Sequence, residues 1–167
     1  MKIETTRLLI TDFTPDMAAT LSRISLDADV QCFVPDEVFP TEEIAAEVIA
    51  DLSALYGTTD GPLVHPVLLD KELIGYVQMV PLEEGEWEIG YHISAEHTGK
   101  GFASEAVCAF LPVMMDLLGL NRVTGVCLAE NAASCRVLEK CGFVLDFAGQ
   151  DSYQGHPAQI RRYHYSR

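Results

Sequence analysis

The sequence predicts a single domain of the α/β class, in which strands and amphipathic helices pack around one core. Three observations support this prediction. The chain has 167 residues, enough for one domain with a substantial core. Apolar residues recur at helical spacing in some segments and alternate with polar residues in others. A strand-like segment, a glycine-bearing turn and a long apolar helical pattern follow one another over residues 87–118. We therefore expect residues 1–167 to form one domain.

The first half of the chain begins with a strand and two helices. Thr14 and Pro15 are typical of a helix N-cap and first helical position. Thr41 has the same capping chemistry before the second apolar pattern. The elements expected here are a strand at 7–12, a helix from 14 to 24, a loop at 32–40, a helix from 41 to 55, and hairpin strands at 63–69 and 73–80.

The second half is expected to alternate strands and helices. Pro112 lies inside the main helix, where a proline removes one helical hydrogen bond and should kink it. Ala133, Val137 and Leu138 mark the apolar stripe of a short helix, and Gly142 suits the position after it. The elements expected here are a strand at 86–93, helices at 102–118 and 131–141, and strands at 122–128, 143–148 and 160–165.

The run GKGFASEA at residues 99–106 has the features of an anion site. Its glycines let backbone N–H groups approach a phosphate closely, and the following helix N-terminus favours negative charge. A P-loop is excluded because Lys100 precedes the second glycine. A dinucleotide fingerprint needs a third glycine where Ser104 stands. An ordinary strand–helix turn is the alternative interpretation.

A second motif, ENAASCRVLEKCGF at residues 130–143, follows about 30 residues later. Together the two motifs resemble the acyl-CoA-binding core of the GNAT superfamily of N-acetyltransferases. The segments 3–10 and 88–91 are similar to those of the RimJ/RimL-type branch. The resemblance covers nearly the whole chain. It implies a mixed, mostly antiparallel central sheet of about seven strands flanked by about four helices.

The resemblance implies acetyl transfer from acetyl-CoA to a primary amine by direct attack in a ternary complex. The glycine turn would bind the pyrophosphate, although Thr98 replaces the long polar residue of the usual Q/R-x-x-G-x-G/A pattern. Lys100 either adds charge there or is a solvated loop lysine, and we interpret Glu105 as a helix-start residue. Asn131 would cap the short helix and also bond the pantetheine. The expected cofactor-binding residues are Tyr91, Ile93, Thr98, Gly99, Lys100, Gly101, Phe102, Ala103, Ser104 and Asn131.

The acceptor amine must lose a proton before it attacks, because an ammonium has no lone pair. Strand alternation places Glu88, Gly90 and His92 on one polar face. Glu88 is the leading base candidate, since the family often keeps a carboxylate on this strand. A carboxylate that orients the acceptor and a surface acid are its alternatives. His92 is the second candidate because its usual pKa range suits a base at neutral pH.

The tetrahedral oxyanion requires a fixed N–H donor, expected from the backbone between Tyr91 and Ile93. The leaving thiolate would also benefit from a donor. Many family members place a tyrosine just before E-K-x-G-F, but Leu138 stands there and cannot donate. Ser134 is the remaining candidate for this role. Its alternative is local bonding within the first helical turn.

Composition excludes several other classes of function. The formal net charge of −14 argues against nucleic acid as a partner. No apolar run approaches the ~20 residues of a membrane helix, and no signal pattern is present. The five cysteines form no C-x-x-C pair, which indicates reduced thiols, three of them in the core. The five histidines lack ligand spacing, so no metal is expected. These features predict a cytoplasmic protein.

The segment 24–70 holds ten acidic residues and no Lys or Arg. It is either a solvated face or a field that attracts a cationic acceptor. The acceptor is therefore expected to be a peptide α-amine or a small cationic amine, and the resemblance allows a homodimer. Two other functions remain open. One is a non-catalytic acyl-CoA sensor, suggested by Thr98 and Leu138. The other is an acyltransferase that modifies antibiotics or polyamines.

Overall fold

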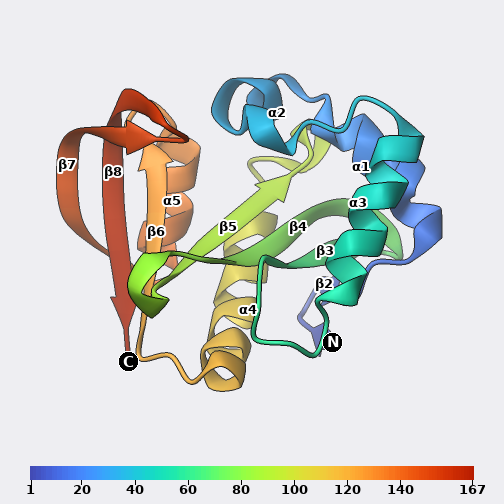
Figure 1. The fold of residues 1–167 in the computed structure, drawn as a ribbon, viewed down its shortest axis with the longest axis horizontal. Coiled ribbons are helices and arrows are strands. Elements are labelled where there is room, and N and C mark those ends of the chain that lie inside the picture. The colour runs from blue at the N-terminus through green and yellow to red at the C-terminus, as the bar shows by residue number, and fades with distance from the viewer.

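One sheet of eight strands, in the order β1-β2-β3-β4-β5-β6-β8-β7, forms the centre of the molecule (Figure 1). The computed structural model describes residues 1–167. All neighbouring strands are antiparallel except β5 and β6, which are parallel. The strands are β1 (Ile3–Glu4), β2 (Leu8–Ile10), β3 (Leu63–Leu69), β4 (Glu72–Pro81), β5 (Trp87–Ile93), β6 (Arg122–Leu128), β7 (Val144–Tyr153) and β8 (His156–Ser166). The helices are α1 (Ala18–Ser25), α2 (Ala28–Phe33), α3 (Glu42–Ala54), α4 (Phe102–Leu118) and α5 (Ala132–Lys140).

This architecture confirms the mixed, mostly antiparallel sheet expected from the sequence, with one more strand and one more helix. The added strand is β1, which pairs with β2 over two residues. The expectation of a loop at 32–40 is wrong in part. Helix α2 reaches Phe33, and a 3₁₀ turn, η2, covers Pro35–Glu37. Val30 is the only buried residue of α2, so its amphipathic signal is weak.

The core has two parts, one on each face of the sheet. Helices α4 and α5 cover one face, with side chains such as Phe110, Met114 and Leu138 fully buried. Helices α1 and α3 cover the other face and bury Leu21 and Ile49 against β3 and β4. Figure 1 shows α4 behind the sheet and α1 and α3 together at one end of it. Both faces of β4 are therefore packed, and the strands that carry the site are held firmly.

Helices α4 and α5 border the site, and local sequence signals fix where α5 begins and ends. Asn131 accepts a hydrogen bond from the Ser134 N–H at 3.0 Å, which confirms it as the N-cap of α5. Gly142, at φ 85°, ends the helix in the left-handed region. The apolar stripe differs at one position from the one expected. Ala133 is exposed, and Cys135 is buried in its place. Helix α4 runs through Pro112 to Leu118 as one helix.

Strands β5 and β6 touch at one point and then separate. The only paired position between them joins Glu88 to Thr124. In Figure 1, β6 lies alongside the neighbouring antiparallel strand β8, while β5 turns away toward α2. Beyond Glu88, the edge of β5 that faces β6 therefore lacks a strand partner. This divergence opens the sheet in its middle and determines where the site lies.

Candidate active site

A cavity of about 650 Å³ lies where β5 and β6 diverge. It is lined from both faces of the sheet, by Glu88 and His92 on one face and by Tyr91 and Ser134 on the other. The alternation expected along β5 is confirmed, because Trp87, Ile89 and Ile93 are buried in the core. The cavity also contains most of the other predicted site residues: Ile93, Thr98, Gly99, Gly101, Phe102, Ala103, Ser104 and Asn131.

The glycine turn at residues 98–104 has the geometry of an anion site. Gly99 and Gly101 have φ values of 74° and 82°, which glycine adopts without strain. The first helical hydrogen bond of α4 runs from the Glu105 N–H to the Gly101 carbonyl at 3.0 Å. The N–H groups of the preceding three residues are therefore left without a partner inside the helix. These donors lie at the positive end of a 17-residue helix and can bind a phosphate oxygen.

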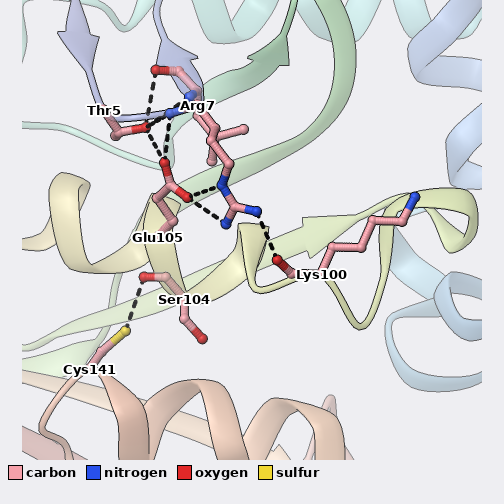
Figure 2. Close-up of polar contacts among 7 residues, drawn as sticks. Thr5, Arg7, Lys100, Ser104, Glu105 and Cys141 are labelled. Atoms are coloured by element: carbon pink, nitrogen blue, oxygen red, sulfur yellow. Dashed lines mark hydrogen bonds and ion pairs between the residues drawn. The ribbon is translucent and has the colours of Figure 1, made fainter.

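The turn is held in place by Arg7, which precedes β2 (Figure 2). Its guanidinium donates to Glu105 at 2.7 Å and to the Lys100 carbonyl at 3.0 Å. The same group lies 4.3 Å above the ring of Phe102. Thr5 also donates to Glu105, at 2.6 Å. Burial opposes ionisation of Glu105, but these hydrogen bonds outweigh it and lower its pKa. Glu105 is thus a charged helix-start residue neutralised by Arg7.

Lys100 is placed apart from the cavity. Its Nζ donates to the Glu96 carbonyl at 2.9 Å, and its side chain is exposed. The lysines and arginines that line the cavity are instead Arg136 and Lys140, both on α5. Positive charge thus reaches the cavity from the helix within the second sequence motif.

Glu88 lies on β5 at the point of divergence and faces the cavity. Burial is the main effect that raises the pKa of its carboxyl to about 7. A hydrogen bond from the Val126 backbone lowers this pKa, and the charge of Glu37 raises it. A carboxyl group with this pKa exchanges its proton near neutral pH. It therefore has the property that a general base at this position needs.

His92 is also in the cavity, but its environment differs. Burial lowers its pKa, although Asp27 and Asp29 oppose this effect. Its Nε2 is buried without a hydrogen bond and lies 4.0 Å from the Asp27 carboxylate. At neutral pH its imidazole is therefore uncharged, with one ring nitrogen free to bond a ligand.

Glu37 is a site residue that sequence reasoning missed. It comes from η2 and lines the cavity, where Tyr76 and Gln78 on β4 both donate to its carboxylate. Burial raises its pKa, and these two hydrogen bonds oppose that shift. Gly90 makes room for this arrangement, because a Cβ there would lie 2.6 Å from the Gln78 side chain. No local motif marks Glu37, since only the fold brings η2 over β4 and β5.

The hydroxyl of Tyr91 was also missed, because the alternation placed its side chain in the core. It donates to the Ser134 carbonyl at 3.0 Å and lies 2.9 Å from the Ser134 hydroxyl. The Leu138 side chain, in contrast, is 1% exposed in the core and offers no donor. Tyr91 therefore brings a phenol to α5 from the strand instead of from the helix.

The hairpin of β7 and β8 closes the cavity on the side of α2. Tyr153 donates to the Phe33 carbonyl at 3.1 Å, and Gln154 donates to Asp36 at 2.7 Å. Burial raises the pKa of Tyr153 to about 12, so its phenol stays protonated. These contacts join segments about 120 residues apart and could not be read from local patterns.

Two further properties of the structure bear on function. No group of three His, Cys, Asp or Glu side chains is arranged to hold a metal ion. None of the helices combines the length and apolar character needed to cross a membrane.

Comparison with known proteins agrees with this geometry. The family model described as "Acetyltransferase (GNAT) domain" matches residues 7–144. The uncharacterized N-acetyltransferase YnaD of Bacillus subtilis is 32% identical over 145 residues, covering 85% of this chain and 82% of that protein. A GNAT-family acetyltransferase of Bacillus anthracis has a crystal structure that superposes with a TM-score of 0.82 at 27% identity. The match covers 99% of this chain and 98% of that one.

A ribosomal-protein L7/L12 α-N-acetyltransferase, RimL, solved in complex with coenzyme A, superposes with a TM-score of 0.85 at 19% identity. That match covers 99% of this chain and 98% of that one, and it shows a shared fold. The chain described here belongs to the GNAT acetyltransferase family. It is an acetyl-CoA-dependent N-acetyltransferase.

Proposed function

We propose that the protein transfers the acetyl group of acetyl-CoA to a cationic primary amine, by direct attack within a ternary complex. One observation carries the proposal: a single cavity holds the phosphate-binding turn at residues 98–104 and the two carboxyl groups of Glu37 and Glu88. The turn fits the pyrophosphate of the cosubstrate. The carboxyl groups fit an amine that must be bound as a cation and then deprotonated.

Glu88 is proposed as the general base, in line with its position at the divergence of β5 and β6 and its pKa of about 7. The unpaired edge of β5 between Tyr91 and Ile93 supplies N–H groups that are free to bond the developing oxyanion. Ser134 and the Tyr91 hydroxyl are proposed to stabilise the leaving thiolate from the other face. Glu88 would thus act on the thioester from one face of the sheet, and the pair of Ser134 and Tyr91 would act from the other.

The acceptor is proposed to be cationic because the part of the cavity near α2 and η2 is lined by acids. Asp29, Asp36 and Glu37 all lie there, while the basic residues of the cavity are on α5. The acidic stretch seen in the sequence therefore contributes directly to the site. RimL is described as an α-N-acetyltransferase of a ribosomal protein, which makes a peptide α-amine one candidate acceptor. A small polyamine is the other, because it carries a second charge.

Thiol release from acetyl-CoA, measured over a panel of amines, tests the function. The panel should contain a neutral amine, a diamine, a polyamine and peptides with a free α-amine. We expect turnover with a cationic member and an acceptor KM that rises with salt, because the acids attract the acceptor through charge. Turnover confined to the neutral amine would contradict the proposed acceptor class. Loss of thiol release in Glu88→Gln, with full activity in the exposed control Glu86→Gln, would support the base.

A further inference from the structure

Four of the five cysteines are arranged as two close pairs, and both pairs hold α5. Cys108 on α4 lies next to Cys141 at the end of α5, with the two sulfurs 2.7 Å apart. Cys127 on β6 lies next to Cys135 within α5, with the sulfurs 3.2 Å apart. The fifth cysteine, Cys32 on α2, is exposed and belongs to neither pair.

The two pairs differ in their access to solvent. Cys127 and Cys135 are each 3% exposed, so neither presents a thiol on the outer surface, although Cys127 lines the cavity. Cys108 is exposed, and its partner Cys141 is buried directly behind it. Thiol–disulfide exchange needs one accessible thiol for the first attack and a second thiol close by to resolve the intermediate. The pair of Cys108 and Cys141 meets both requirements.

The local structure also allows the small movement that a bond between them needs. A disulfide has a sulfur–sulfur distance of about 2.05 Å, so the two sulfurs must approach by roughly 0.65 Å. Cys108 is four residues before Pro112, which has no N–H. The carbonyl of Cys108 therefore lacks its usual helical partner, and α4 is less tightly restrained at this turn.

We propose that Cys108 and Cys141 form a site of reversible oxidation, at which a low-molecular-weight disulfide converts the pair into an intramolecular disulfide joining α4 to α5. The thiolate of Cys108 attacks the reagent, forms a mixed disulfide and releases one thiol. The Cys141 thiol then loses its proton to solvent and attacks the Cys108 sulfur, releasing the second thiol. The protein pair loses two electrons, which reduce the reagent to two thiols. Burial raises the pKa of Cys141, so the closing step becomes faster as pH rises.

The bond would lie beside the cofactor turn. The Cys141 thiol donates to the carbonyl of Ser104 at 3.4 Å, as Figure 2 shows, and Ser104 lines the cavity. Oxidation removes this S–H donor and links the two helices that border the turn. It also closes a loop between residues 108 and 141, which restricts the unfolded chain. We expect the midpoint of thermal unfolding to rise by about 5–10 °C.

The test treats the reduced, full-length protein with oxidised glutathione at pH 8 and maps its cysteines by mass spectrometry. We expect a peptide pair linked through Cys108 and Cys141, glutathione on Cys32 alone, and unmodified thiols at Cys127 and Cys135. A reductant should restore both the free thiols and the original unfolding midpoint. A glutathione adduct that persists on Cys108, a link between Cys127 and Cys135, or no loss of the Cys108 thiol would overturn the proposal.

Two variants separate the steps. Cys141→Ser should trap glutathione on Cys108, because no thiol remains to displace it. Cys108→Ser changes an exposed position and should keep the fold, while it abolishes the linked peptide and the shift in unfolding midpoint. Cys32→Ser is the matched control, since it removes an exposed thiol that has no partner. A shift that survives in Cys108→Ser would contradict the assignment.

Discussion

The hydroxyl groups of Tyr91 and Ser134 lie 2.9 Å apart and connect β5 to the first turn of α5 across the cavity. The phenol proton of Tyr91 points to the Ser134 carbonyl, so the serine hydroxyl is the donor of the remaining pair. Burial strongly raises the pKa of Tyr91 and keeps the phenol neutral. This end of the site therefore carries two neutral hydroxyl groups in one network, and a proton must turn from its present acceptor before either group can donate to the leaving thiolate.

Ser134→Ala is expected to lower kcat by about tenfold and to leave the KM of both substrates nearly unchanged. Tenfold corresponds to about 1.4 kcal/mol, the size of one hydrogen bond that is made only in the transition state. Tyr91→Phe should have a similar effect, and the double variant should lose less than the product of the two, because the groups act together. The exposed Ser166→Ala is the control. Full activity in Ser134→Ala would remove Ser134 from the mechanism.

The pH profile distinguishes the two candidate bases. If Glu88 is the base, kcat rises with pH through a midpoint near pH 7, the pKa set by its burial, and levels off above it. If His92 is the base, the corresponding limb lies below the usual histidine pKa, because burial lowers that value. We expect the limb near pH 7 and its loss in Glu88→Gln, together with a fall in kcat of at least about 100-fold. A limb that is unchanged in Glu88→Gln would identify another group.

The same carboxyl group should make folding pH-dependent. Its folded pKa of about 7 lies above the unfolded value, so the folded state binds the proton more tightly. This contribution favours folding below the unfolded pKa and is lost as pH rises through 7. Glu88→Gln removes the cost of the buried charge and should stabilise the protein at pH 8 by on the order of 3 kcal/mol. Thermal unfolding at pH 5 should show little difference between the two proteins.

Glu37→Gln is expected to raise the acceptor KM by about tenfold or more and to leave the KM of acetyl-CoA unchanged. The substitution keeps the size of the side chain but removes a charge that Tyr76 and Gln78 hold in place. Its effect should shrink at high salt and disappear with a neutral acceptor. Glu47→Gln, on the exposed face of α3, is the charge-matched control. Equal effects of the two variants would indicate a general field instead of a specific contact.

Arg7→Ala is expected to weaken CoA binding by about tenfold and to lower the unfolding midpoint by a few degrees. The guanidinium is partly exposed, so its pair with Glu105 alone contributes no more than about 1 kcal/mol. Its bond to the Lys100 carbonyl and its stacking on Phe102 act on the turn itself. Arg7→Lys should recover little, because a lysine lacks the planar fork. Calorimetric titration with CoA checks this, and Lys2→Ala, from an exposed ion pair, should change nothing.

The strands, the main helix and the glycine turn could be predicted because their signals are local. Alternation along β5, the caps of α5 and the positive φ of Gly101 each depend on a few neighbouring residues. Helix α2 could not be predicted, because one buried residue in six leaves no clear period. Its position over the cavity depends on packing.

The candidate site was predicted in part for the same reason. Glu88 lies on a strand with a clear polar face, so its place in the cavity could be anticipated. Glu37 could not, since it reaches β4 from a segment about 40 residues earlier in the chain. Strand alternation correctly placed the ring of Tyr91 against the core, but it gave no sign that the hydroxyl contacts Ser134. Its ring packs against the core while its hydroxyl reaches the cavity.

The contact between Thr5 and Glu105 spans 100 residues of sequence. A loop of this length closes at an entropic cost that local interactions within residues 98–105 cannot offset. The glycine turn at residues 98–104 should therefore acquire its final order late in folding, after the strands between these two residues have assembled. A peptide that contains only the turn and α4 should bind CoA weakly, and grafting this motif into another protein would require a counterpart of Arg7 as well.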